Sequence, residues 1–285
     1  MPLIDPLAAV HPDAQLADSV QVGPFCIVEA DVTIGDGCRL EARSTIKRGV
    51  RLGTQNYICE GAVLGGRPQS LGAGEVIGRL LIGDGNQIRE NATLHCGLAP
   101  GKDTIVGDNN FFMVGVHIGH DCRIGNHTIM ANNTMLGGHV TVEDRAFISG
   151  NVAVHQFCRI GSLAMVGGQA RVTRDIPPFV TIDGESSLMV GLNRVGLKRA
   201  GFSRQEVADI KAAYRLAFRG ELPWDEMLAS LKQQFTGGPG AQFAEFLTGG
   251  TRGFVRERRE LKGKTLKLHA PDSAAAGPEE LRKAG

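Results

Sequence analysis

Large apolar residues, nearly all of them aliphatic, recur at every sixth position along most of this chain. One run starts at Val10 and ends at Leu64, and a second starts at Val106 and ends at Val172. Most residues four places further on are small, with cysteine, alanine, serine or threonine at that position. A six-residue self-similarity is typical of a parallel β-helix, in which three hexads make one coil. The pattern therefore predicts an all-β solenoid whose aliphatic side chains fill a triangular prism and whose turns form its corners.

The six-residue frame fails in two places. The first break covers about residues 66–80 and the second about residues 98–104. A solenoid accommodates an insertion only where it loops out, often beside a binding face. Both loops are therefore candidate walls of a site, although plain surface loops would give the same pattern.

The end of the hexads divides the chain into parts. The repeats place the β-helix domain at residues 1–185. Ser203 and Glu206 then form a capping-box pattern that predicts a helix, which Gly220 is expected to end. We expect residues 186–253 to form a small α-helical C-terminal domain that covers the last coil, because a solenoid needs a terminal cap. The charged and then Ala-, Gly- and Pro-rich residues 254–285 are expected to be a disordered tail.

The composition argues against several classes of protein. The formal net charge is +1, so no broad attraction to nucleic acid or to a membrane surface is expected. No stretch approaches the roughly 20 apolar residues of a membrane span, and the first residues lack the features of a signal peptide. Four of the six cysteines take the small inward position of the hexad, where a thiol acts as a compact hydrophobe. These features predict a cytoplasmic protein with unpaired thiols, no stable membrane insertion and no nucleic-acid partner.

The histidines are the candidate chemical groups. Six of the eight lie between positions 95 and 155, and none of these six takes the inward aliphatic position. His120, His139 and His155 are spaced so that successive coils bring them close together at or beside one corner. One of them could act as a general base, because the pKa of histidine lies near neutral pH. Several could instead bind zinc, which prefers three imidazoles and a water, or the corner could be a binding scaffold without chemistry.

The segments around these histidines resemble a known enzyme family. The main matching segments are His117-Ile118-Gly119-His120-Asp121-Cys122, Ala131-Asn132-Asn133, Gly137-Gly138-His139-Val140 and Ala153-Val154-His155-Gln156-Phe157-Cys158. They are similar to the UDP-N-acetylglucosamine O-acyltransferase family, which carries out the first step of lipid A biosynthesis. The resemblance implies a left-handed parallel β-helix, a homotrimer, and active sites in clefts between neighbouring subunits. It also implies transfer of a 3-hydroxyacyl chain from acyl carrier protein to the 3-hydroxyl of UDP-N-acetylglucosamine, with no metal and no cofactor.

The resemblance also gives roles to individual residues. His120 matches the general base of the family, Asp121 would orient its imidazole, and the backbone N–H of Gly138 would stabilise the oxyanion. Gly168 matches the position that limits acyl-chain length and, having no side chain, is expected to admit a long chain. The other residues expected to contact or adjoin the substrate are Gln69, His95, His117, His139, His155, Gln156, Asn193 and Arg199.

The chain departs from the family on the acceptor side. Ser70 and Gly72 replace an acidic and a basic residue of the first loop, and Val195 and Ala200 replace an acidic residue and an arginine near the nucleotide. The loss of a charged hydrogen-bond partner typically costs about 1.5–3 kcal/mol. Either the nucleotide sugar is held differently, with the arginines of the first loop as candidates, or the acceptor is another one, such as an amino-sugar nucleotide acylated on nitrogen.

Overall fold

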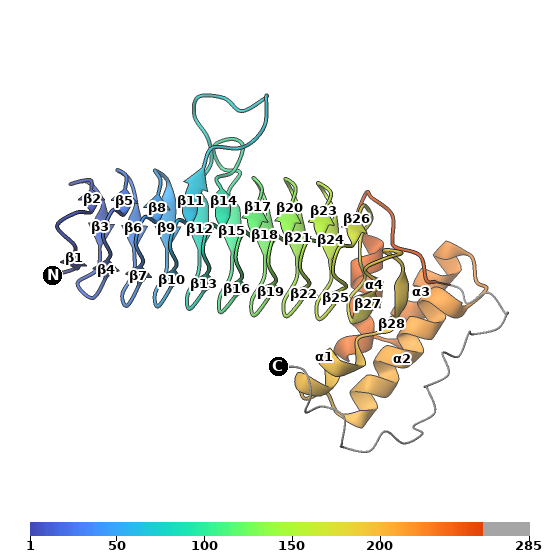
Figure 1. The fold of residues 1–285 in the computed structure, drawn as a ribbon. Coiled ribbons are helices and arrows are strands. Elements are labelled where there is room, and N and C mark those ends of the chain that lie inside the picture. Colours follow the sequence, from blue (N-terminus) through green and yellow to red (C-terminus); the bar gives the residue numbers. More distant parts are fainter. Residues whose placement is uncertain (259–285) are drawn as a thin grey trace, which may run out of the picture.

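The computed structural model describes residues 1–258, which form a triangular prism of short strands with a helical cap at one end (Figure 1). The three sides of the prism are an 11-stranded, a 9-stranded and an 8-stranded sheet, which we call sheets A, B and C. The chain visits the three sheets in turn, so neighbouring strands within a sheet come from successive coils. All strand pairs are parallel except the last pair of sheet A, β27 with β28.

The strands are short, and each sheet adds one strand per coil. In spatial order, sheet A consists of β1 (Leu3–Ile4), β4 (Gln21–Val22), β7 (Arg39–Leu40), β10 (Tyr57–Ile58), β13 (Gln87–Ile88), β16 (Phe111–Phe112), β19 (Ile129–Met130), β22 (Phe147–Ile148), β25 (Met165–Val166), β27 (Val180–Ile182) and β28 (Met189–Leu192). Sheet B consists of β2 (Ala9–Val10), β5 (Ile27–Val28), β8 (Thr45–Ile46), β11 (Val63–Gly66), β14 (Thr93–His95), β17 (His117–Ile118), β20 (Met135–Leu136), β23 (Ala153–Val154) and β26 (Arg171–Val172). Sheet C consists of β24 (Arg159–Ile160), β21 (Thr141–Val142), β18 (Arg123–Ile124), β15 (Thr104–Val106), β12 (Leu80–Ile82), β9 (Val50–Leu52), β6 (Thr33–Ile34) and β3 (Gln15–Leu16).

Burial confirms the inward positions predicted by the hexads. From Val22 to Val172 the aliphatic residue of each hexad is at most 4% exposed. Val10 and Leu16 are only partly buried, because their coil lies at the open N-terminal end of the prism and lacks a neighbour on one side. The core is therefore one continuous column of mostly aliphatic side chains, and any site for a polar ligand must lie on its outside.

The corner between sheets B and C, which we call the BC corner, carries both insertions. The first lies between β11 and β12 and projects from the prism, and the second lies between β14 and β15 (Figure 1). Asp31, Asp121, His139 and Phe157 occupy equivalent positions at this corner, each in the left-handed backbone conformation, with φ between 54° and 67°. The two breaks in the hexad frame are thus loops, as the sequence pattern predicted, and both lie on one edge of the molecule.

The cap contains four helices: α1 (Arg194–Arg199), α2 (Arg204–Arg219), α3 (Trp224–Gln234) and α4 (Gly238–Thr248). The predicted capping box at the start of α2 is present, because the Ser203 side chain accepts from the Glu206 N–H and the Glu206 carboxylate accepts from the Ser203 N–H. Gly220 follows the last residue of α2, as predicted. The sequence pattern did not predict α1, a helix of six residues, which is too short to show a helical period.

The first residues of the predicted tail pack against the protein. Val255 is buried, and Phe254 forms a β-bridge with Asp175. The Tyr214 hydroxyl donates a hydrogen bond of 2.6 Å to the Glu257 carboxylate. These contacts extend the ordered domain to residue 258, and the rest of the predicted tail, residues 259–285, lies outside the described residues.

The four cysteines at the small inward position of the hexad lie where the pattern expects them. All six cysteines are buried free thiols, and burial raises the pKa of Cys96 to about 11, which keeps its thiol protonated at neutral pH. Within residues 1–258, no helix has the length and apolar character needed to cross a membrane.

Candidate active site

Successive coils stack two sets of equivalent residues at the BC corner. The sets are His120, Gly138 and Gln156, and, one position further along the turn, Asp121, His139 and Phe157. Backbone hydrogen bonds fix the stacking, because His139 N donates to His120 O over 2.9 Å and Phe157 N donates to Gly138 O over 3.1 Å. The rings of His120 and His139 meet edge to face with their centroids 5.1 Å apart. The closeness predicted for these two histidines is therefore confirmed.

His120 and Asp121 form a hydrogen-bonded pair. Nδ1 of His120 lies 2.6 Å from Oδ2 of Asp121, and the two side chains are only 13% and 7% exposed. The Asp121 carboxylate also accepts from the Leu98 N–H, and the Asp121 N–H donates to Oγ1 of Thr104. A carboxylate facing Nδ1 keeps the proton on that nitrogen. Nε2 of His120 is then the basic atom, so the pair has the geometry of a general base and its orienting carboxylate.

Gly138 lies directly over the imidazole of His120. A Cβ built on Gly138 would lie 2.6 Å from Nε2 and Cε1 of His120, which is closer than carbon atoms can approach. A residue with any side chain would therefore displace the ring or cover its basic nitrogen. Within the described residues, the Gly138 N–H donates no hydrogen bond, so it is available to an oxygen that develops negative charge next to Nε2.

His95 and His117 form the N-terminal side of the same corner. Their ring centroids are 5.0 Å apart, Nδ1 of His117 is 2.9 Å from Oγ1 of Thr93, and Nδ1 of His95 is 2.7 Å from the carbonyl oxygen of Arg67 in the first loop. Burial is the main cause that lowers the pKa of both imidazoles below the ordinary value. Both rings are therefore neutral at neutral pH and can offer a substrate one donor and one acceptor each.

His139 lies between the catalytic candidates and an aromatic ring. Its Nε2 is 3.7 Å from Oδ2 of Asp121, too far for a hydrogen bond, and its ring stacks face to face on Phe157, with centroids 4.5 Å apart and planes 8° from parallel. Burial lowers the pKa of His139, while the nearby Asp121 opposes that shift. Sequence reasoning missed Phe157. Phe157 lies one coil after His139, at the same corner position. A bulky side chain there is itself a signal, because that left-handed position favours glycine or small polar residues.

His155 and Gln156 lie on the next coil and are exposed. Nδ1 of His155 is 3.1 Å from Nη2 of Arg252, which arrives from beyond α4, and 3.2 Å from the carbonyl oxygen of Gln156. A guanidinium can only donate and a carbonyl oxygen can only accept, so Nδ1 of His155 can form a hydrogen bond with only one of these two partners in a given tautomer. Sequence reasoning also missed Arg252, because 97 residues separate it from its partner.

The corner also offers atoms that could ligate a metal. The ligand atoms of His120, Asp121 and His139 lie within 4.8 Å of one another. The set contains two imidazoles and one carboxylate, whereas the zinc interpretation expected three imidazoles. The 2.6 Å contact between His120 and Asp121 is the length of a hydrogen bond with its proton in place. The arrangement thus fits proton transfer better than metal binding.

Asn193 and Arg199 lie away from the histidines. Together with Val195 and Ala200 they line a cavity of about 650 Å³ between α1 and the outer face of sheet A. His127, the sixth clustered histidine, lines the same cavity. In a triangular prism, sheet A is the side opposite the BC corner. One copy of the chain therefore does not bring Asn193 and Arg199 to His120.

The remaining predicted residues lie on the first loop and at another corner of the prism. Gln69 is exposed on the first loop. Gly168 lies at the turn between sheets A and B, where a Cβ would lie 3.4 Å from the carbonyl oxygen of Gly150, which leaves room for a side chain. Ser70 accepts a hydrogen bond from the Gly72 N–H, so these two residues shape the loop tip and present no charge.

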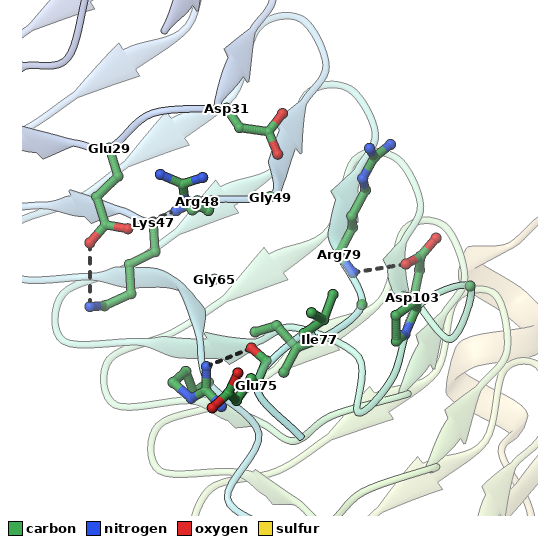
Figure 2. Close-up of a pocket in the computed structure, with 15 residues that line it drawn as sticks. Glu29, Asp31, Lys47, Arg48, Gly49, Gly65, Glu75, Ile77, Arg79 and Asp103 are labelled. Atoms are coloured by element: carbon green, nitrogen blue, oxygen red, sulfur yellow. Dashed lines mark hydrogen bonds and ion pairs between the residues drawn. The ribbon is translucent and has the colours of Figure 1, made fainter. Parts of the chain in front are cut away.

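A second cavity lies on the N-terminal side of the first loop (Figure 2). It has a volume of about 880 Å³ and is lined by acidic and basic residues in equal number, among them Lys47, Arg48 and Arg79. Arg67, a loop candidate for holding the nucleotide sugar, instead donates to the carbonyl oxygens of Gly74 and Glu75 and so braces its own loop. No histidine of the BC corner lines this cavity.

Comparisons with known proteins agree with the fold of the prism and the cap. The family model for bacterial transferase hexapeptide repeats matches residues 13–48 and 103–138. The model for the second domain of UDP-N-acetylglucosamine O-acyltransferase matches residues 175–255, which span the cap. The two models thus cover parts of the prism and the helical cap separately.

Whole-length relatives and solved structures are also similar. Acyl-[acyl-carrier-protein]–UDP-N-acetylglucosamine O-acyltransferase of Halorhodospira halophila is 43% identical over 258 residues, covering 90% of this chain and 100% of the relative. The protein of the same name from Anaeromyxobacter dehalogenans is 46% identical, covering 89% of this chain and 99% of its own. The crystal structure of UDP-N-acetylglucosamine acyltransferase from Francisella novicida superposes with a TM-score of 0.86 at 36% identity, covering 90% of this chain and 94% of its own.

Proposed function

The chain belongs to the UDP-N-acetylglucosamine O-acyltransferase family, and from this premise we propose that it moves a 3-hydroxyacyl chain from acyl carrier protein to the 3-hydroxyl of UDP-N-acetylglucosamine. That transfer is the first step of lipid A biosynthesis. The family relationship supports the reaction class, and the geometry of the BC corner supports the roles of individual residues.

We assign the general base to His120. Its Nε2 takes the proton of the sugar hydroxyl while the hydroxyl oxygen forms a bond to the thioester carbonyl carbon. Asp121 holds the Nδ1 proton and stabilises the imidazolium that results. General-base catalysis of this kind typically contributes about 10²- to 10⁴-fold to the rate.

The oxyanion is assigned to the Gly138 N–H. As the new C–O bond forms, the carbonyl electron pair moves onto its oxygen, beside the N–H of Gly138, a residue whose backbone lies against the His120 ring. One such donor is typically worth about 2.7–4 kcal/mol. When the C–S bond breaks, the pantetheine thiolate takes the proton from Nε2, which restores the neutral base.

The complete site is proposed to include residues of two copies of the chain. The base lies at the BC corner, whereas Asn193 and Arg199 lie on the opposite side of the prism. Only a second copy, with its sheet A facing the BC corner of the first, can bring both groups to one nucleotide sugar. A heterologous contact of this kind can close into a ring, and the homotrimer that the family resemblance implies would contain three such clefts.

One observation carries the proposal: the short Nδ1–Oδ2 contact leaves Nε2 of His120 as an accessible base beneath a glycine that cannot be replaced without covering it. The test is an acyl-transfer assay with purified protein, a 3-hydroxyacyl carrier protein and UDP-N-acetylglucosamine. We expect turnover that is lost in His120→Ala. Full turnover by that variant would contradict the assignment.

The losses of charge at the acceptor side favour one alternative within the same chemistry. Ser70 and Gly72 supply no charge in the loop, and Val195 and Ala200 supply none in the sheet A cavity. An acceptor with a 3-amino group, acylated on nitrogen, would use the same base and donor. The assay therefore includes the 3-amino analogue of UDP-N-acetylglucosamine, and turnover of that analogue alone would replace the hydroxyl as acceptor.

A further inference from the structure

We propose that Phe157 is a positioning residue for catalysis: by stacking on His139 it holds that imidazole away from Asp121, so that His120 is the one imidazole that hydrogen-bonds to the carboxylate. The proposal rests on the proposed function of His120 and Asp121 and adds a residue that touches neither of them.

The backbone at Phe157 indicates that the fold does not require a phenylalanine there. Its φ is 67°, in the left-handed region that glycine, asparagine and aspartate tolerate best. The equivalent corner positions on other coils hold Asp31, Gly49, Asp121 and His139. Phe157 is also 46% exposed, so it adds little to the core. A bulky apolar residue in a strained and exposed position needs another explanation.

The explanation lies in what the ring touches. One face of Phe157 covers His139 in a parallel stack with a centroid distance of 4.5 Å. The same imidazole meets the His120 ring nearly at a right angle, with centroids 5.1 Å apart. Between these two rings, Nε2 of His139 lies 3.7 Å from Oδ2 of Asp121.

That distance matters because His139 competes for the carboxylate. Asp121, His120 and Lys102 are the charged or titratable groups that act on His139, and only Asp121 favours its protonation. Without Phe157 the ring would gain water and rotational freedom. It could then turn toward Asp121 and, once protonated, donate to the oxygen that now accepts from His120. The base would lose both its orientation and its countercharge.

The test separates positioning from structure. Phe157→Asn removes the ring and suits the left-handed backbone, as Asn133 and Asn151 show at other corners of this chain. We expect an equal or higher melting temperature together with a kcat that is roughly 3- to 10-fold lower, in line with the strength of aromatic stacking. Phe157→Tyr retains the stack and should restore kcat.

A matched control uses Phe25, which is exposed and left-handed like Phe157 (φ 59°) but lies near the N-terminal end of the prism. Phe25→Asn should leave kcat unchanged.

A second readout is the pH profile of kcat. In Phe157→Asn its acidic limb should move to higher pH, because an uncovered His139 protonates more readily.

The result that would overturn the proposal is an unchanged kcat and pH profile in Phe157→Asn while His120→Ala is inactive. A parallel fall of kcat and melting temperature that Phe157→Tyr does not rescue would also overturn it. Full activity of His120→Ala would instead remove the proposed function on which the inference depends.

In a double-mutant cycle, Phe157→Asn should have no further effect on kcat in a His139→Asn background, because the phenyl ring acts through that imidazole.

Discussion

The BC corner has the same backbone over most of its length but two kinds of side chain. Near the N-terminal end its left-handed position holds Asp31 and then Gly49, and Asp31 pairs with Arg51 near the surface. Beyond the two loops the same position holds Asp121, His139 and Phe157. Asp121 hydrogen-bonds to His120, and His139 meets the His120 ring on one side and stacks on Phe157 on the other. The solenoid therefore supplies a repeated backbone scaffold, and the residues placed on it decide where chemistry occurs.

The largest difference between the two regions is expected when the same substitution is made in two equivalent aspartates. Asp121→Asn leaves an amide beside Nδ1, which can donate to the ring and place its proton on Nε2. We expect kcat to fall by about 10²- to 10⁴-fold. Asp31→Asn, at the same corner position, removes only a near-surface ion pair worth about 1 kcal/mol or less and should leave kcat unchanged. Equal effects of the two substitutions would remove the distinction between the two regions.

A smaller but still large effect is expected at Gly138. Its backbone is not in the left-handed region, so alanine adds no conformational strain, but the new methyl group would collide with the His120 ring. Gly138→Ala should lower kcat by roughly 10²-fold and leave the thermal unfolding curve close to that of the parent. If Gly138→Ala turned over at the wild-type rate, the reacting atoms of the substrate would not occupy the space over Nε2 of His120.

The acceptor loop gives an effect of intermediate size. Ser70→Asp together with Gly72→Lys restores the charges that the family carries there. If the acceptor is UDP-N-acetylglucosamine, its KM should fall about tenfold or more, while the KM for the acyl donor stays constant. A KM for the nucleotide sugar that is unchanged or higher would indicate a loop adapted to another acceptor.

The smallest effect concerns stability and pH. Burial lowers the pKa of His95, His117 and His139 below the ordinary 6.5. As the pH falls through 6.5, these histidines take up protons in the unfolded chain before they do so in the folded chain. The stability that the buried neutral rings contribute is therefore complete above pH 6.5 and is lost below it. Denaturant titrations on both sides of pH 6.5 should show this loss as a fall in the free energy of unfolding. The double variant His95→Gln/His117→Gln should reduce the slope of that free energy against pH. An identical slope in that variant would contradict the burial of these rings.

Much of the prism could be predicted from the sequence because its period is short and regular. The hexads place Leu40 or Ile118 in the core without any knowledge of distant contacts, and the coil length brings His120 to His139. The same reasoning does not find Arg252, whose contact with His155 depends on how the cap folds back. It also does not show that Asn193 lies on the side of the prism opposite the histidines, because a matching motif reports which residues serve a site but not which copy supplies them.

The role of His120 is tested most directly against Arg48, which stands one residue before the left-handed corner position just as His120 does, but near the N-terminal end. The measurement is kcat for transfer to UDP-N-acetylglucosamine at saturating donor, with folding checked by thermal unfolding. If His120 is the general base, His120→Ala should lose about 10²- to 10⁴-fold while Arg48→Ala keeps the parent rate. A folded His120→Ala that turns over as fast as Arg48→Ala would contradict this role.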